Sequence, residues 1–506
     1  MFLAKKLNKG GSLGGYQISR SLRFNRYDGA YLQRAPATNT NQKTWTYSGW
    51  VKRSEKTIDT ANSQHLMRTD TNATLIRFDA NVNRESLRLY GVGGTLDLVT
   101  SALYRDFSAW YHIVVAVDTT QATASNRAKL YVNGSQITAL HTASYPAQNS
   151  DTGFNTTASQ FIGCTAGFIE FYDGYMTEVN FVDGSQLTPS SFGETNAQTG
   201  VWQPKAYSGS YGTNGFYLNF SDNSNTTAAT LGKDYSGNGN NWTPNNFSVT
   251  AGAGNDSLVD SPTSYGTDTG VGGTVRGNYA TLNPLALGAG TLSNGNLDFI
   301  FTGGGFGSKV STIGVTSGKW YCESTVTSLT IGGNGLLFGV SSITETSSYL
   351  GSQSTSYGYY ANSGDKYNNG ASSAYGATLA NNDVVGIALD LDAGTLTFYK
   401  NGTSQGTAFS SLPSGTWYFG ASSTNSATVA MNFGQRPFAY TAPSGFKALC
   451  TQNLPTPTIG ATTATQAGKF FNTILWSGAG SGTTRSLTGV GFQPDWVWTK
   501  SRNGGY

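Results

Sequence analysis

Residues 128–140 read AKLYVNGSQITAL and residues 394–406 read GTLTFYKNGTSQG, so the chain contains one short phrase twice. In each copy apolar and polar residues alternate up to an Asn-Gly pair, which is the period of a half-buried strand. Asn133-Gly134 and Asn401-Gly402 provide the two positive-φ residues that a tight type I′ hairpin turn requires. The repetition therefore predicts two β-hairpins of one design, not a repeated ligand site.

The similarity extends upstream of both hairpins. Residues 110–118, WYHIVVAVD, and residues 384–392, VVGIALDLD, each read as a buried strand that ends in aspartate. Two meanders of this kind, far apart in the chain, indicate two sandwich domains, not a short-period solenoid. We predict an all-β fold class with tandem antiparallel β-sandwiches.

The composition fits this class and excludes several others. Only 12% of the 506 residues are charged, 13% are aromatic and 65 are glycine, a turn-rich profile typical of β-sandwiches. The formal charge of +3 gives no argument for nucleic acid, and no apolar run approaches the ~20 residues that span a membrane. Cys164, Cys322 and Cys450 form neither a disulfide framework nor a CxxC metal site. The start, MFLAKKLNKGG, has no apolar core of useful length, so we expect no signal peptide.

Turn signals and composition divide the chain into five predicted parts. In the third part, residues 206–290, we expect five aromatic side chains to anchor the segment to the first sandwich: Phe216, Tyr217, Phe220, Trp242 and Phe247. The strand pattern at the end of the chain suggests a fragment of a longer polypeptide. The parts are a flexible lead at 1–17, a sandwich at 18–205, a Gly/Asn/Ser-rich segment at 206–290 that packs on this sandwich and links it onward, a second sandwich at 291–450, and a linker with the start of a further β module at 451–506.

Several motifs resemble known families. Residues 18–205 resemble a laminin-G-like, concanavalin A-type lectin/glucanase domain, through YSGWVKRS (47–54), WYHIVVAVD (110–118), KLYVNG (129–134) and GYMTEVNFVDG (174–184). Residues 291–450 resemble a SPRY domain, through GKWYCES (318–324), GYYANSGDKYNNG (358–370), DVVGIALDLDAGTLTFYKNG (383–402) and MNFGQRPF (431–438). The tandem order and the joining SGNGNNWTPNNFSV (236–249) resemble tail-fibre or appendage proteins of bacteriophages. The resemblance implies two concanavalin-like jelly rolls in series.

The same resemblance implies a non-enzymatic virion appendage that attaches to the host cell surface through its loops, by glycan binding. A purely architectural capsid or tail protein is the alternative, and a glycan-degrading enzyme is a third reading. The expected partners are other virion proteins and a host cell-surface glycan or protein, with no nucleic acid and no membrane insertion. The expected assembly is a homotrimer. The expected location is the virion, after synthesis in the host cytoplasm.

The carboxylates argue against the enzyme. Glu170 and Asp173 are three residues apart and would face opposite sides of a strand, and Glu178 lies beyond Gly174. A pair that flanks a glycosidic bond is therefore missing. No serine or cysteine has a plausible triad order with His65, His112 or His141. We expect no catalytic residues.

One stretch has the composition of a binding surface. TSYGYYANSGDKYNNGASSAYG (355–376) mixes tyrosines with Asn and Asp, as sugar-binding loops do. The alternative is that alternate tyrosines are strand positions packed between two sheets. The candidate ligand-binding residues are Tyr357, Tyr359, Tyr360, Asn362, Asp365, Tyr367, Asn368 and Tyr375.

Residues 234–242, DYSGNGNNW, match the first half of a calcium loop. Asp234, Ser236 and Asn238 place oxygens at alternate positions, and Gly239 follows as the sharp turn. The bidentate glutamate expected at the twelfth position is replaced by Asn245. The segment is either a weak calcium site or a turn closed by its own side-chain hydrogen bonds. We expect no other cofactor.

Overall fold

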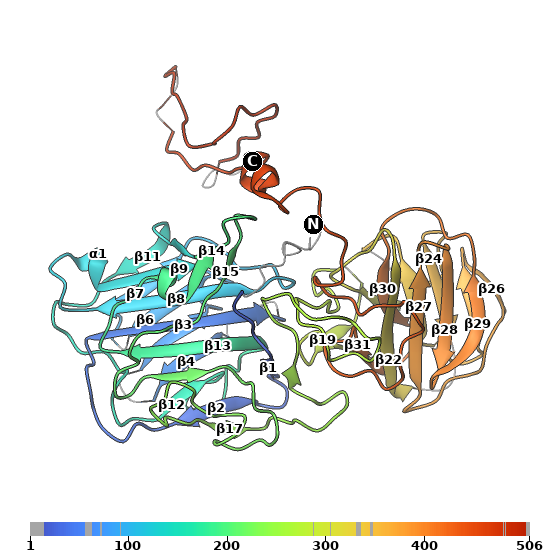
Figure 1. Ribbon diagram of the computed structural model, residues 1–506, viewed down its shortest axis with the longest axis horizontal. Coiled ribbons are helices and arrows are strands. Elements are labelled where there is room, and N and C mark those ends of the chain that lie inside the picture. The colour runs from blue at the N-terminus through green and yellow to red at the C-terminus, as the bar shows by residue number, and fades with distance from the viewer. Residues whose placement is uncertain are drawn as a thin grey trace.

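The computed structural model describes residues 15–55, 63–70, 73–91, 93–286, 288–303, 305–329, 335–344, 348–478, 480 and 482–501, so most of the predicted lead at 1–17 lies outside the described residues. The described residues fold into two β-sandwiches placed side by side along the longest axis (Figure 1). Their helices are short: α1 (Ala124–Arg127), and the 3₁₀ turns η1 (Pro189–Ser191), η2 (Thr463–Thr465) and η3 (Ala467–Lys469). The predicted all-β class of tandem antiparallel sandwiches is confirmed.

The first sandwich consists of two antiparallel sheets. Sheet 1 has the order β10 (Ser135–Gln136), β9 (Ala128–Val132), β8 (Tyr111–Asp118), β3 (Thr44–Arg53), β13 (Gly174–Asp183), β1 (Ser21–Phe24) and β18 (Ser257–Leu258), and β16 (Phe216–Leu218) also pairs with β13. Sheet 2 has the order β11 (Leu140–Ser144), β7 (Leu96–Thr100), β6 (Leu87–Gly91), β5 (Thr74–Phe78), β4 (Gln64–Thr69), β12 (Gln160–Ile162), β2 (Tyr31–Arg34) and β17 (Thr243–Asn245). A separate hairpin joins β14 (Gly193–Thr195) to β15 (Trp202–Pro204).

Strand β8 shows how the sequence pattern builds this sandwich. Ile113, Val115 and Val117 belong to the main core of the sandwich. The intervening Val114 and Ala116 point the other way and join a smaller buried cluster. Sheet 1 is therefore covered on both faces, which is why β8 reads as a continuous apolar run.

The segment after residue 205 enters the first sandwich instead of lying along its surface. Phe216, Phe220 and Trp242 are buried in its core, and β16, β17 and β18 extend its sheets. The predicted boundary at 205 therefore ends the sandwich too early. The sequence did not show this because strands of two or three residues separated by Gly and Asn have no visible period.

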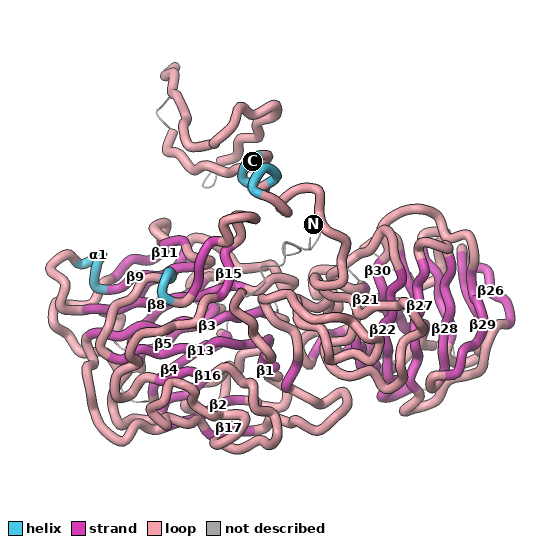
Figure 2. Tube along the Cα trace, viewed as in Figure 1, coloured by secondary structure: helices cyan, strands magenta, loops and turns pink. Residues whose placement is uncertain are grey.

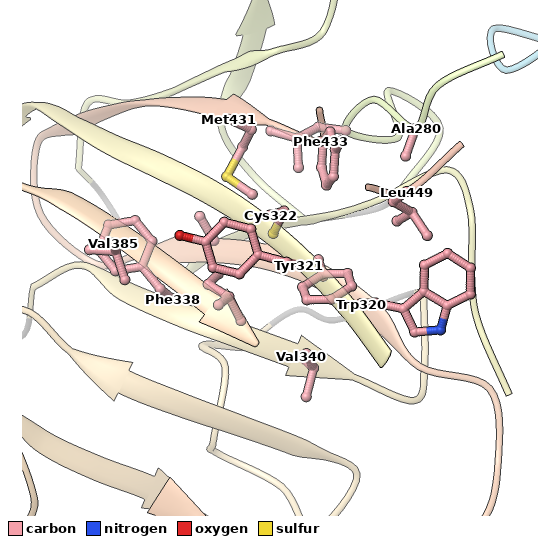
Figure 3. Packing of buried hydrophobic residues seen from close by; sticks show 14 of the residues in the cluster. Ala280, Trp320, Tyr321, Cys322, Phe338, Val340, Val385, Met431, Phe433 and Leu449 are labelled. Carbon is pink, nitrogen blue, oxygen red and sulfur yellow. The ribbon is translucent and has the colours of Figure 1, made fainter. Parts of the chain in front are cut away.

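The second sandwich also consists of two antiparallel sheets around an aromatic core, part of which is drawn in Figure 3. Sheet 3 has the order β19 (Thr291–Ser293), β20 (Asp298–Phe301), β31 (Ala427–Asn432), β22 (Lys319–Leu329), β27 (Val384–Asp390), β28 (Thr395–Lys400) and β29 (Thr403–Phe409). Sheet 4 has the order β21 (Gly307–Val310), β30 (Tyr418–Ser423), β23 (Leu337–Ser341), β24 (Ser356–Tyr360), β25 (Asp365–Asn368) and β26 (Ala371–Ala374).

The two Asn-Gly turns have the same geometry. Both residues of each pair have positive φ, +49° and +82° at 133–134 and +48° and +78° at 401–402. Each asparagine side chain also accepts a hydrogen bond from the neighbouring strand, from the His112 amide in one copy and the Val384 amide in the other, both at 2.8 Å. A ring covers each glycine, so an added Cβ would lie 2.5 Å from Trp202 or Tyr440. These turns need Asn and Gly for structural reasons.

Buried charges join the sandwiches. Lys52 on β3 donates to Asp260 Oδ2 at 2.9 Å, to Asn278 Oδ1 at 2.8 Å and to the Tyr279 carbonyl at 2.8 Å. Trp110 Nε1 donates to the other oxygen of Asp260 at 3.1 Å. Residues 258–282 also contribute side chains to the core that continues into the second sandwich. The segment around Asp260 therefore ties both sandwiches together.

The described part of residues 470–501 has no strands, although FFNTILWSG and FQPDWVWTKSR carry strand patterns. Figure 2 shows it as a loop beyond the sandwiches. The predicted start of a β module is therefore not formed by these residues. A strand requires a paired neighbour, and here Trp496 and Trp498 remain 71% and 73% exposed.

Candidate binding site on the second sandwich

The predicted tyrosines lie on both faces of sheet 4. Successive side chains of a strand point to opposite faces, so Tyr357 and Tyr359 on β24 face inward and Tyr360 faces outward. Tyr359 packs against Phe398 with ring centroids 5.2 Å apart, and Tyr357 packs against Trp417 at 5.5 Å. These two tyrosines are packed between the sheets, as the alternative interpretation of this stretch expects, because sheet 3 covers them.

Tyr375 has the same structural role. Its hydroxyl donates to the Gly406 carbonyl at 2.5 Å and accepts from the Phe398 amide at 3.2 Å. Its ring lies 5.5 Å from that of Tyr359. Tyr375 therefore closes the space between the two sheets and is not available as a flat platform for a ligand.

The outward residues build a small aromatic surface. Tyr367 on β25 shares the outer face with Tyr360, because its partner across the ladder is Gly358. The rings of Phe306, Tyr349, Tyr367 and Tyr360 follow one another with centroid distances of 5.3, 6.1 and 5.7 Å. We call these four residues the outer aromatic cluster.

A pocket opens within this cluster. It has a volume of about 60 Å³ and is lined by Leu337, Tyr349, Tyr360, Tyr367 and Thr424. The Thr424 hydroxyl is buried and has no hydrogen-bond partner among the described residues. Among the described residues, no charged side chain lines the pocket. It offers an apolar recess with one hydroxyl at its wall.

The remaining predicted residues support the strands around this pocket. Asn368 Nδ2 donates to the Ser356 carbonyl at 2.9 Å, and Asp365 accepts from the Ser363 hydroxyl at 2.7 Å. Asn362 lies beside Gly335, and its Oδ1 is buried without a partner among the described residues. Of the eight predicted residues, only Tyr360 and Tyr367 line the pocket.

Sequence reasoning missed the other lining residues. Tyr349 lies six residues before Thr355 and Thr424 lies far beyond residue 376, and both stand in stretches rich in Ser and Thr. Leu337 belongs to β23, which reads as an ordinary buried strand. Sheet topology brings them together, because β23 pairs with both β24 and β30. No local pattern in the sequence could have shown this pairing.

The predicted calcium loop is held by its own hydrogen bonds. Asp234 accepts from the amides of Tyr217, Ser236 and Asn240, each at 2.8 Å, and from the Ser236 hydroxyl at 2.8 Å. Asn238 Nδ2 donates to the carbonyls of Gly212 and Gly215. Within the described residues, no group of three or more His, Cys, Asp or Glu side chains could hold a metal. Calcium at this loop stays a prediction, and it would have to displace these donors.

The carboxylates of the first sandwich lie in separate environments. Glu170 approaches His65 Nε2 at 3.1 Å and Arg77 Nη1 at 3.9 Å, next to sheet 2. Asp173 is buried and accepts from the Ser54 hydroxyl at 2.5 Å. Glu178 sits in a bulge of β13 with a φ of +52° and accepts from Tyr16 and Tyr217. These three carboxylates therefore do not form a pair that flanks one cleft.

Glu178 makes the stability of the fold depend on pH. Burial raises the pKa of Glu178 from 4.5 to about 7, although both tyrosines donate to it. The folded chain therefore retains a proton that the unfolded chain loses, so this group's contribution to stability falls as pH rises from 4.5 to 7. The free energy of unfolding of Glu178→Gln should match that of the wild type near pH 4.5 and exceed it by roughly 3 kcal/mol at pH 8. Urea unfolding at both pH values measures this difference. If the free energies of unfolding of the two proteins changed by the same amount between these pH values, the prediction would be contradicted.

Comparisons with known proteins agree with this architecture. Residues 26–191 match the family model of the concanavalin A-like lectin/glucanases superfamily, and residues 319–436 match the SPRY domain model. The chain carries a laminin-G-like domain followed by a SPRY domain. Residues 466–506 match a domain of unknown function, DUF7483.

Among curated proteins, the chain is similar to Ran-binding proteins of vertebrates. It is 36% identical over 86 residues to Ran-binding protein 10 of Danio rerio and to Ran-binding protein 9 of Mus musculus and Homo sapiens. The matched stretch covers 17% of this chain and only 12–14% of those proteins. The similarity is therefore that of one domain.

Solved structures of SPRY domains are also similar to part of the chain. The SPRY domain of human HERC1 is 24% identical, covers 30% of this chain and 96% of its own, and has a TM-score of 0.28. The TRIM65 PSpry domain is 17% identical, with coverages of 30% and 91% and a TM-score of 0.25. At these identities the similarity does not extend to function.

These comparisons correct the predicted function. The reading as a bacteriophage appendage for host attachment is wrong, because the curated relatives are vertebrate Ran-binding proteins. The tandem order suggested phage proteins, but domain order alone does not fix function. Within the described residues, no helix is long and apolar enough to cross a membrane.

Proposed function

We propose that this chain is a non-enzymatic protein-interaction molecule, whose SPRY sandwich binds a short segment of a partner protein at the outer aromatic cluster. The size and lining of the pocket carry this proposal. Its volume of about 60 Å³ lies far below the roughly 300–1,000 Å³ of sites that enclose a small molecule. A recess of this size suits one small apolar side chain of a peptide.

The chemistry around the pocket supports a peptide partner. Tyrosines supply large contact areas at low cost in side-chain entropy, which is why they dominate many protein-binding surfaces. The unpartnered Thr424 hydroxyl can pair with a backbone group of the bound segment. Because the described residues that line the pocket are all uncharged, we expect a partner segment with a neutral, small apolar residue at its centre.

The relatives favour the same class of function. Their name states that they bind Ran. For this chain we take over only the class, a protein partner, because the match covers so little of those proteins. The separated positions of Glu170, Asp173 and Glu178 support the absence of catalysis.

A peptide library displayed on yeast tests this function. The full chain should enrich peptides that share a small apolar residue, and Tyr367→Ala should weaken the best of them at least about tenfold, since it removes one wall of the pocket. Tyr27→Ala is the matched control, because Tyr27 is an exposed tyrosine of the first sandwich. Calorimetric titration measures both affinities, and thermal melts confirm that both variants are folded. Equal binding by all three chains would contradict the proposed site.

A further inference from the structure

The outer aromatic cluster lies over strands that already have a neighbour on each side. β23 pairs with β24 and β30, β24 pairs with β23 and β25, and β25 pairs with β24 and β26. Because the backbone groups of these strands are used by the sheet, a bound segment cannot be added here as a further strand. The cluster has to recognise its partner through side chains.

The side chains of the cluster enclose the recess on several sides. The ring of Tyr367 lies between two others, and it makes an angle of 87° with the ring of Tyr349 and of 79° with that of Tyr360. Leu337, which pairs with Tyr360 across the ladder and is 3% exposed, forms an apolar floor. Aromatic walls on adjacent sides and an apolar floor fit one small apolar ring.

The loop that carries Tyr349 is held in place. The next residue, Leu350, is buried, and its amide donates to Ser422 Oγ at 2.9 Å. Gly351 has a φ of +91° and approaches Tyr367 so closely that an added Cβ would lie 2.5 Å from it. The recess is therefore preformed. A partner segment that is also ordered before binding would lose little conformational entropy on binding.

The polar groups that line the recess are hydroxyls. Thr424 carries a buried hydroxyl without a partner among the described residues, and Tyr349 and Tyr367 carry phenolic hydroxyls. No carboxylate or carboxamide belongs to the described lining residues. An N–H group buried in such a recess would have few acceptors and would cost free energy. A residue without an N–H group avoids this cost, and a carbonyl beside it can accept from the Thr424 hydroxyl.

We propose that the outer aromatic cluster binds a proline-rich segment in the polyproline II conformation, with one proline ring in the recess. This inference rests on the proposed function and specifies the class of segment that the site binds. Proline has a small apolar ring and no N–H group, and its fixed φ limits the conformations that the free segment can adopt. Aromatic-lined grooves bind such segments in several domain families.

The cluster also indicates the spacing of the prolines. A polyproline II helix has three residues per turn, so residues three apart point to the same side, about 9 Å from each other. Phe306 is 42% exposed, and its ring centroid lies 5.3 Å from that of Tyr349, which in turn lies 6.1 Å from that of Tyr367. These distances place Phe306 within reach of a second proline. We therefore expect the pattern Pro-x-x-Pro.

A display library in two halves tests this inference. One half carries Pro-x-x-Pro at the centre of each peptide and the other Ala-x-x-Ala, and the remaining positions are randomised among uncharged residues. The full chain should enrich peptides from the proline half. Replacement of both prolines by alanine should weaken the best peptide at least about tenfold in calorimetric titration.

Variants of the chain locate the binding. Tyr367→Ala should weaken the best proline peptide at least about tenfold, and Phe306→Ala and Thr424→Val should each weaken it several-fold. Thr424→Val removes the hydroxyl and retains the shape of the side chain. Phe306→Ala alters an exposed side chain, so its melting temperature should match that of the wild type. Thermal melts of all three variants separate a loss of binding from a loss of folding.

The other outcomes overturn the inference in distinguishable ways. Equal enrichment from both halves, with binding that the variants weaken, would retain the proposed function and overturn the preference for proline. A library without any peptide that depends on Tyr367 and Phe306 would overturn the proposed function and this inference together. Proline peptides that bind all three variants as tightly as the wild type would have their site elsewhere, which also contradicts the inference.

Discussion

His112→Gln should remove a large part of the protein's sensitivity to acid, with the rest retained by the other buried histidine, His65, whose pKa burial lowers to about 4. His112 is buried between Trp50 and Trp202, whose rings stack on it at 4.9 and 6.0 Å. Trp202 Nε1 donates to Nδ1 at 3.0 Å and Ser48 Oγ lies 2.9 Å from Nε2, so both ring nitrogens are used by the neutral form. Burial lowers the pKa of His112 from 6.5 to about 3.

The sign of the effect follows from these two values. The unfolded chain takes up a proton on this residue near pH 6.5, whereas the folded chain resists it until about pH 3. The contribution of His112 to the free energy of unfolding is therefore fully present above pH 6.5. It falls by roughly 5 kcal/mol as the pH drops toward 3. The free energy of unfolding of the variant should be about 1 kcal/mol lower than that of the wild type at neutral pH, because the stacking is weaker. It should then fall less steeply than that of the wild type as the pH drops.

Urea unfolding at pH 7, 5.5 and 4.5 measures both slopes. His141→Gln serves as the matched control, because His141 is exposed on β11 and its loss tests the removal of a histidine as such. The wild type and the control should lose stability together, while His112→Gln loses less. A variant that tracks the wild type would show that His112 does not cause the acid sensitivity.

Lys52→Met should destabilise the protein by about 3–5 kcal/mol, the usual cost of leaving one charge of a buried pair without its partner. Lys52 and Asp260 are both almost completely buried, with side-chain exposures of 0% and 1%. The substitution also removes the donor to Asn278 and to the Tyr279 carbonyl. Because these groups join β3 to the segment shared with the second sandwich, the single unfolding transition should broaden or split.

Two further variants make this result specific. Lys43→Met removes an exposed pair with Asp151, 3.9 Å long, and should cost less than about 0.5 kcal/mol. Asp260→Asn added to Lys52→Met removes the stranded charge and should recover part of the loss. Differential scanning calorimetry measures all three. A loss below about 1 kcal/mol for Lys52→Met would contradict the structural role assigned to this pair.

The fold was readable from the sequence because its strands carry strong local signals. The alternation around Leu130 and Phe398 and the two Asn-Gly turns specify hairpins without any long-range information. The same signals fail for β16, β17 and β18, which have two or three residues each and form only because existing strands pair with them. They also fail after residue 470, where strand patterns have no partner strand in the described chain.

Only part of the candidate site could be predicted from the sequence, for a geometric reason. The strand period places Tyr357 and Tyr359 on one face and Tyr360 on the other, but it does not say which face is covered. That depends on sheet 3, whose Phe398 and Phe409 pack against the inward tyrosines. Tyr349 and Phe306, which complete the outer cluster, reach it from loops that lie outside residues 355–376. Composition pointed to the right stretch, and topology selected the residues.

The central claim is that the outer aromatic cluster of the SPRY sandwich receives a partner segment. A photo-crosslinking residue, benzoylphenylalanine, at Phe306 tests it most directly, because Phe306 is exposed beside the pocket and lies next to Tyr349. With the library-selected peptide, position 306 should crosslink, whereas the same residue at Tyr27 on the first sandwich should not. Crosslinking from position 27 with none from position 306 would contradict the account.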